Sequence, residues 1–311
     1  FALGGYQVRG YDEHPQARDT LHERVRHGLE AFVAGGQLAA EAVEDVLGRI
    51  QVADSEQQAV ARAQFVVEAI AENLAAKQAY FTRIEQFVAD ATIIASNSST
   101  FTVSAAGTGM RLPERAVVTH WFNPPHLVPT VEVVPGPDTY RKVTETTVAL
   151  HRKIGKLAVT VNREVPGFLV NRVQIAMIRE VWDLYEQGVA SPADIDAAIR
   201  GSLGFRLALY GPLEICDFGG VNIWSTVYQG LAPELRSDAT LPDAVRKLVE
   251  AGRHGTSSGA GFFDYESTSP GAAEAGRQAA IARATAERDA AMLKLAALLH
   301  DQPGPAEKQQ P

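Results

Sequence analysis

A histidine and a glutamate, His120 and Glu132, stand on either side of two prolines in the segment THWFNPPHLVPTVEVV, residues 119–134. An imidazole takes up a proton near neutral pH, and a carboxylate beside it fixes its tautomer and stabilises the imidazolium. Glu132 lies in an apolar run, where a carboxylate needs a partner. The prolines exclude a helix and stiffen the connection. The segment therefore predicts a His120–Glu132 pair acting as a general base, with a packed or solvated histidine as the alternative.

Polar side chains also follow a series of short apolar runs in the first part of the chain. The runs cover residues 6–12, 64–70, 92–97 and 116–120, and the polar residues at or just after their ends are Asp12, Glu72, Asn97, Ser98, Ser99 and His120. Ligands of open parallel sheets bind beyond the carboxyl ends of the strands. The pattern therefore predicts a site at that edge, although any one of these residues could simply belong to a polar turn.

The elements that must hold these residues alternate between strand and helix. The runs are apolar almost throughout, as expected for strands covered on both faces, and helical stretches at 17–35 and 74–90 separate them. Further strands are predicted at 128–134 and 156–161. This order predicts an α/β domain with a doubly wound, parallel, Rossmann-type sheet over residues 1–162.

The remainder of the chain has a helical pattern. Helices are predicted from about 165 to Gly188, at 191–199 with Ser191 as N-cap, and at 212–230, 241–251 and 271–300. We expect an all-α domain at 163–268, then a C-terminal helix and a disordered tail, 301–311, within residues 269–311.

Charge and cysteine content exclude several classes of protein. The net charge of −8 comes without a basic stripe, so no nucleic acid partner is expected. No apolar run is long enough to span a bilayer, so no membrane partner is expected either. The lone Cys216 excludes an internal disulfide and indicates a reducing, cytoplasmic location. We predict no metal site.

Asp12 ends what would be the second strand of a dinucleotide-binding unit. A carboxylate there accepts hydrogen bonds from a ribose and repels a 2′-phosphate, which favours NAD over NADP. The alternative is an N-cap for a helix near Pro15. The glycine-rich loop and first strand that should precede Asp12 are absent from the sequence, which opens on Phe1. We expect that residues precede Phe1 in the native protein and that the sheet lacks a central strand without them.

Several motifs resemble the 3-hydroxyacyl-CoA dehydrogenase superfamily over about residues 1–265. They are VVEAIAEN with Lys77, IIASNSST, THWFNPP with VEVV, VPGFLVNRV and GVASPADIDAAI. The resemblance implies that His120 takes the substrate hydroxyl proton while hydride passes to NAD, and that Glu132 orients His120. It also implies that Ser99 and Asn171 bind the reacting oxygen. Finally, it implies cofactor contacts for Asp12, Glu72, Lys77, Asn97 and Asn123.

Structural alternatives stay open for three of these residues. Ser99 could be a helix N-cap, Asn171 a polar residue near the start of a helix, and Lys77 one end of a surface salt bridge.

Three departures from the family pattern bear on the substrate. Lysines suited to CoA phosphates are missing from 30–38, and Ser257 and Ala260 stand where the family often has basic residues. The segment LGFRLALYGPLE, 203–214, resembles the branch that contains gulonate, carnitine and pyridine-carboxylate dehydrogenases. Arg206 could there form a bidentate pair with a substrate carboxylate, or bond a local acid at the surface.

Together these features predict an NAD-dependent oxidoreductase that oxidises a small 3-hydroxy-carboxylate and forms a homodimer. A 3-hydroxyacyl-CoA dehydrogenase, such as one acting on 3-hydroxybutyryl-CoA, is the alternative. A non-catalytic, crystallin-like structural protein is an alternative of another class.

Overall fold

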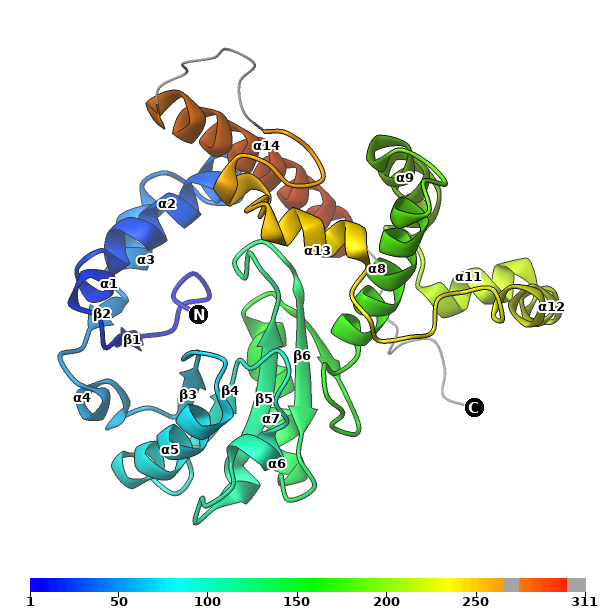
Figure 1. Ribbon diagram of the computed structural model, residues 1–311. Helices are drawn as coiled ribbons and strands as arrows, with labels where there is room; N and C mark the ends of the chain where they lie inside the picture. The colour runs from blue at the N-terminus through cyan, green and yellow to red at the C-terminus, as the bar shows by residue number, and fades with distance from the viewer. Residues whose placement is uncertain (266–273, 301–311) are drawn as a thin grey trace. The chain divides into compact units, whose positions relative to one another are not determined.

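The computed structural model describes residues 1–265 and 274–300, which form parts of two compact units, Phe1–Arg172 and Val173–Pro311 (Figure 1). Each unit is described by itself below. The predicted tail, 301–311, and the first residues of the predicted C-terminal helix, 271–273, lie outside the described residues. The domain boundary predicted at 162/163 stays a prediction.

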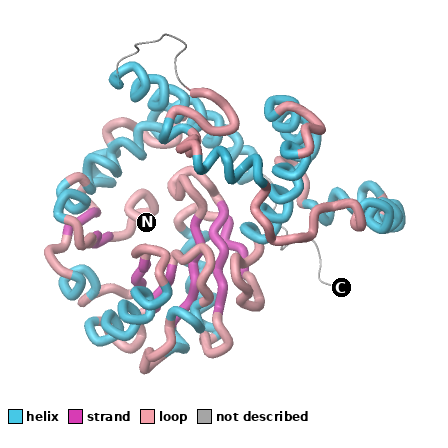
Figure 2. Tube along the Cα trace, viewed as in Figure 1, coloured by secondary structure: helices cyan, strands magenta, loops and turns pink. Residues whose placement is uncertain are grey.

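The first unit holds seven strands, and the six strands predicted from the sequence are all among them. β1 (Val8–Gly10) pairs in parallel with β2 (Ile50–Val52), a three-residue strand that the sequence pattern missed. The five-stranded sheet contains, in this order, β3 (Phe65–Glu68), β4 (Ile93–Ser96), β5 (Ala116–Trp121), β6 (Thr130–Pro135) and β7 (Leu157–Thr160). These strands lie side by side in Figure 2.

Helices cover both faces of the larger sheet, which explains why its strands are apolar almost throughout. The helices of this unit are α1 (Pro15–Asp19), α2 (Leu21–Ala34), α3 (Ala42–Leu47), α4 (Glu56–Val60), α5 (Leu74–Ile84), α6 (Val103–Ala106) and α7 (Arg141–Lys153). On one face Ile94 and Val118 pack with Phe81 of α5. On the other face their neighbours Ala95 and Val117 pack in a second cluster, against which α7 lies.

The sheet is parallel from β3 to β5, but β6 runs antiparallel to β5, and β7 follows the direction of β6. The parallel sheet expected from the sequence is therefore corrected at this point. A parallel crossover needs about a dozen residues or more, and the connection 122–129 is too short for one. In the antiparallel register His120 lies directly opposite Glu132.

β1 and β3 are edges that face a common cavity. They belong to separate sheets and are not hydrogen-bonded to each other. The cavity has a volume of ≈ 2090 Å³, and its lining includes Val8 and Arg9 of β1, the residues of β3 and, from the turns that follow, Tyr11, Asp12 and Ile70.

The second unit is helical in its described residues. α8 (Val170–Glu186) begins in the first unit and continues into the second, and it is followed by α9 (Pro192–Ile199), α10 (Phe205–Leu207), α11 (Pro212–Gly219), α12 (Val221–Leu231), α13 (Asp243–Glu250) and α14 (Glu274–His300). Ser191 caps α9, as predicted. The helix predicted at 212–230 is divided at Gly220, whose φ of 84° suits glycine. Within residues 1–265 and 274–300, no helix combines the length and the apolar character that crossing a bilayer requires.

Candidate active site

His120 and Glu132 form the buried hydrogen bond that their spacing predicted. The strand register sets them opposite each other, and His120 Nδ1 lies 2.7 Å from Glu132 Oε2. Their side chains are 3% and 0% exposed. An ionised carboxylate only accepts hydrogen bonds, so Nδ1 carries the proton and Nε2 carries the lone pair when the ring is neutral. In the neutral ring, Nε2 is therefore the proton acceptor.

The second oxygen of Glu132 holds the start of α8. Oε1 accepts hydrogen bonds from the backbone N–H groups of Leu169 and Val170, at 3.0 and 2.9 Å. Gly167 and Phe168, just before them, have positive φ angles of 74° and 50°. A left-handed conformation is unfavourable for phenylalanine, so this turn is held by its surroundings. Glu132 thus ties β5 and β6 to the helix that carries Asn171.

Two aromatic rings flank the His120 imidazole. Its centroid lies 4.5 Å from that of Phe122 and 5.5 Å from that of Phe168, both in tilted arrangements. Phe168 is fully buried. The rings pack against the imidazole, whose hydrogen bond with Glu132 is buried.

The connection between β5 and β6 is held by Lys156 as well as by its prolines. Lys156 Nζ donates to the carbonyl oxygens of Pro125 and Val128, at 2.7 and 2.8 Å, and lies 5.1 Å from the centroid of the Trp121 ring. Burial lowers the pKa of Lys156 to about 8. Lys156 therefore stabilises the connection between β5 and β6, a role that the sequence pattern did not predict.

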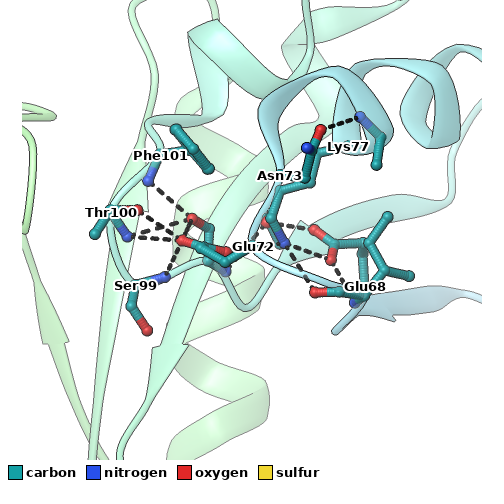
Figure 3. Close-up of polar contacts among 11 residues, drawn as sticks. Glu68, Glu72, Asn73, Lys77, Ser99, Thr100 and Phe101 are labelled. Atoms are coloured by element: carbon teal, nitrogen blue, oxygen red, sulfur yellow. Dashed lines mark hydrogen bonds and ion pairs between the residues drawn. The ribbon is translucent and has the colours of Figure 1, made fainter. Parts of the chain in front are cut away.

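Ser99 and Asn171, 72 positions apart, also meet. Asn171 Nδ2 donates to the backbone oxygen of Ser99, at 3.2 Å. Ser99 is not the helix cap that the sequence left open, because Thr102 caps α6. In Figure 3 its side chain points away from Glu72.

Glu72 binds the backbone of the same loop. Its Oε1 accepts hydrogen bonds from Ser98 Oγ and Thr100 Oγ1, at 2.6 and 2.7 Å, and from the N–H groups of Ser99 and Thr100, both at 3.1 Å (Figure 3). Burial alone would raise the pKa of Glu72, but the hydrogen bonds from Ser98, Thr100 and Lys77 lower it to about 2. This carboxylate stays charged throughout the physiological range.

Lys77 lies in a buried ion pair. Its side chain is 1% exposed, and Nζ lies 2.8 Å from Glu68 Oε1 and 3.2 Å from Glu72 Oε2. The salt bridge that the sequence left open is therefore present, but it is buried rather than at the surface. Glu68 was missed, although the signal that singled out Glu132, a carboxylate inside an apolar run, applies equally to it.

The other predicted cofactor residues differ in their surroundings. Asn97 Oδ1 accepts from the Trp121 N–H, at 3.0 Å, and Asn123 is exposed. Asp12 Oδ1 accepts from the His14 N–H, so it forms a turn and does not cap α1. Of these five predicted contacts, only Asp12 lines the cavity between β1 and β3. An exposed carboxylate at the end of a parallel strand is suited to accepting a hydrogen bond from a ribose hydroxyl.

Arg206 belongs to the second unit. It lies in α10, is exposed, and donates from Nε to the backbone oxygen of Ser202, at 3.3 Å. Its predicted contact with a substrate carboxylate stays a prediction.

Family models match almost the whole described chain. The "3-hydroxyacyl-CoA dehydrogenase, NAD binding domain" matches residues 1–165, and the "3-hydroxyacyl-CoA dehydrogenase, C-terminal domain" matches residues 167–265. The chain therefore belongs to the 3-hydroxyacyl-CoA dehydrogenase family, which confirms the predicted resemblance, the Rossmann-type fold, the NAD cofactor and the class of NAD-dependent oxidoreductase.

Individual relatives differ in what their names describe. The 5-formyl-3-hydroxy-2-methylpyridine 4-carboxylate 5-dehydrogenase of Mesorhizobium japonicum is 34% identical over 273 residues, 85% of this chain and 84% of the relative. The lambda-crystallin of Oryctolagus cuniculus is 33% identical over 254 residues, 80% of each chain. A solved structure described as this pyridine-carboxylate dehydrogenase, "an NAD+ dependent dismutase", has a TM-score of 0.84 and 30% identity, covering 97% of this chain and 93% of the other.

Proposed function

We propose that this family member oxidises the hydroxyl group of a small 3-hydroxy-carboxylate-type substrate with NAD, and that His120 is the general base. The buried His120–Glu132 hydrogen bond is the observation that supports this most directly. A family fold alone does not specify a reaction, but an imidazole with a carboxylate on Nδ1 and an available Nε2 lone pair is suited to taking a proton.

The roles of the side chains follow from their chemistry. His120 Nε2 takes the hydroxyl proton of the substrate, and Glu132 stabilises the imidazolium that results. The Ser99 hydroxyl and the Asn171 amide donate hydrogen bonds to the same substrate oxygen as it becomes a carbonyl. Asp12 accepts from the cofactor ribose, Asn123 contacts the cofactor, and Asn97 lines the same crevice. Bound NAD supplies the hydride acceptor.

Two features favour a free carboxylate over a CoA ester. The segments that carry basic residues in the CoA enzymes lack them here, and Arg206 supplies a guanidinium suited to a carboxylate. The name of the pyridine-carboxylate dehydrogenase relative also describes a small carboxylate substrate. The family description keeps a 3-hydroxyacyl-CoA ester as the alternative substrate.

An assay of NADH formation with a panel of small 3-hydroxy acids and with 3-hydroxybutyryl-CoA tests the substrate class. We expect turnover of an acid. Arg206→Ala should raise its KM roughly 10- to 100-fold, the effect of losing one charge-assisted pair. Arg200→Ala, at an exposed arginine that precedes this segment, should leave the KM unchanged. Turnover of the CoA ester alone, or an unchanged KM, contradicts the proposed substrate.

Replacement of His120 tests the base. His120→Asn should lower kcat roughly 10²- to 10⁴-fold with NAD affinity retained. If the unmodified protein binds NAD but turns over neither substrate class, this would instead support a non-catalytic, crystallin-like structural protein.

We also propose that the protein is a homodimer in the cytoplasm.

A further inference from the structure

Lys156 lies where the turn between α7 and β7 meets the connection between β5 and β6. Hydrogen bonds fix the backbone on both sides of its side chain: the Lys156 N–H donates to the carbonyl oxygen of His151, and the Leu157 N–H donates to that of Pro129, both at 2.9 Å. The first bond anchors the turn to α7, and the second anchors it to the connection. The lysine therefore has a fixed backbone from which its side chain reaches residues 122–129.

The Lys156 ammonium contacts the connection at three points. Nζ donates to the carbonyl oxygens of Pro125 and Val128, at 2.7 and 2.8 Å, and lies 5.1 Å from the centroid of the Trp121 ring. A charged donor strengthens hydrogen bonds, and an aromatic face attracts a cation. Pro125 is exposed, so water can satisfy its carbonyl group. A water molecule would not join both carbonyl groups and the ring to the turn before β7, as the ammonium does.

Prolines limit the hydrogen bonds that the connection can make for itself. Pro124, Pro125 and Pro129 have no backbone N–H group. The Leu127 and Val128 N–H groups both donate to the Pro124 carbonyl oxygen, at 3.1 and 3.0 Å. These two bonds stay within one turn of the chain, so the ammonium supplies a link from this turn to the start of β7.

The same connection carries a ring that packs against the candidate base. Phe122 is its first residue, and the Phe122 ring centroid lies 4.5 Å from that of His120. Asn123, a predicted cofactor contact, comes next. Just before them, the Trp121 N–H donates to Asn97 Oδ1 at 3.0 Å. Phe122 and Asn123 therefore lie between a point held by Asn97 and the points held by the ammonium.

We propose that Lys156 is a positioning residue that acts through the connection on Phe122 and Asn123, beside the His120 base. The role rests on the proposed function, because it concerns the placement of these groups in that reaction. Lys156→Met keeps an unbranched side chain but removes the charge and both hydrogen bonds. The connection should then move more freely, and the imidazole should lose a fixed neighbour.

Hydrogen–deuterium exchange of the full chain tests the link without any catalytic readout. In Lys156→Met the amides of Leu127 and Val128 should exchange faster, because the turn that protects them opens more often. Lys153→Met is the matched control, since the Lys153 ammonium also lies over a ring, 5.3 Å from the centroid of Tyr6, which is outside the connection. The control should leave exchange at 127 and 128 unchanged.

Kinetics separate positioning from a merely structural role. Lys156→Met should lower kcat roughly 10- to 100-fold, the cost of a small misplacement, with the KM of the substrate within about threefold of the original. Lys156→Arg keeps a cation with several N–H donors and should retain kcat to within about threefold. Lys153→Met should leave kcat unchanged.

The charge of Lys156 gives the role a dependence on pH. Burial lowers the pKa of this amine to about 8, since the charged form is disfavoured away from water. A neutral amine donates weaker hydrogen bonds and loses its attraction to the Trp121 ring. The kcat should therefore fall as the pH rises through about 8, and Lys156→Arg should lack this fall, because a guanidinium stays charged.

Other titratable groups face Lys156 or share its connection. Burial lowers the pKa of His151 and that of the Phe1 amino group below their ordinary values of 6.5 and 8.0, so both lose their protons before Lys156 does. His126 lies on the connection, and its ring faces Phe32 of α2, with 6.3 Å between the centroids.

Fluorescence detects the ionisation of Lys156 directly, because its ammonium lies over one of the three tryptophans of the chain. With Trp182→Phe and Trp224→Phe in place, the emission of Trp121 should change with a midpoint near pH 8. The change should be absent when Lys156→Met is added.

The possible results are distinct. Unchanged exchange at Leu127 and Val128 in Lys156→Met overturns the proposal, and so does faster exchange with an unchanged kcat. If the unmodified protein turns over neither substrate class, faster exchange in the variant supports the link to the connection while the proposed function fails. If Lys156→Met does not fold, Lys156→Gln, which keeps a polar but uncharged side chain, makes the same test of exchange and kcat, with the same results overturning the proposal.

Discussion

At the scale of single residues, Glu132 has the most demanding position in the candidate site. It is fully buried, and its two oxygens accept one hydrogen bond from His120 and two from the start of α8. A buried carboxylate is tolerated when donors satisfy it in this way. The same interactions therefore serve both stability and the orientation of the His120 ring.

Glu132→Gln should lower kcat roughly 10²-fold or more and reduce the free energy of unfolding by about 1–3 kcal/mol. The amide lacks the negative charge that stabilises the imidazolium, and its NH₂ group faces donors. Steady-state assays and urea denaturation measure the two effects. Glu145→Gln, at an exposed residue paired with Arg141, should change neither appreciably. Activity within about threefold of the original in Glu132→Gln would contradict the assigned role.

At the scale of elements, the turn before α8 determines where its first N–H groups point. Gly167 and Phe168 both adopt positive φ, and the N–H groups that follow reach Glu132. β5 and β6 contribute the other half through their antiparallel register. The site is thus a junction of three elements: β6 carries Glu132, β5 carries its partner His120, and the turn before α8 places the two N–H donors.

Gly167→Ala should cost about 1 kcal/mol of stability, since φ of 74° is unfavourable for alanine, and should also lower kcat by shifting the Leu169 and Val170 amides. A Cβ at Gly167 meets its nearest atom only at 3.6 Å, so backbone strain is the main effect. Gly188→Ala is a matched control, because Gly188 has φ of 67° and open space. Equal losses of kcat in both variants would show that the turn has no special role.

At the scale of the whole molecule, the ionisation of Glu72 makes the free energy of unfolding depend on pH. The folded pKa of Glu72, about 2, lies below its ordinary value of 4.5, so the unfolded chain binds more protons between these values. The stability that Glu72 contributes is therefore complete above pH 4.5 and lost as the pH falls through about 2.

The difference in unfolding free energy between the original protein and Glu72→Gln should accordingly shrink as the pH is lowered from about 6 to 3. Urea denaturation at several pH values measures it. A difference that stays constant or grows over this range would contradict the depressed pKa of the carboxyl group.

The helical unit carries large apolar side chains that are exposed in the single chain. Leu213, Phe218 and Tyr228 are 80%, 71% and 71% exposed, all on α11 and α12. Exposed apolar groups in such number mark association surfaces. We expect light scattering to report twice the 33.4 kDa of one chain, and Leu213→Glu to weaken the dimer while Tyr140→Glu, at an exposed residue of the first unit, does not. A monomer at all concentrations would exclude this homodimer.

Local sequence patterns alone predict many of the strands of this protein and part of its candidate site. Continuous apolar runs predicted six strands because burial on both faces leaves such a trace, and the carboxylate within VEVV predicted a partner for Glu132. The shortness of 122–129 could have predicted the antiparallel pair. Tertiary structure alone decided which partners met: Lys77 with Glu68 and Glu72, and Asn171 with Ser99 across 72 positions. These contacts depend on how elements pack, and the spacing of residues along a chain carries no information about distances between its distant parts.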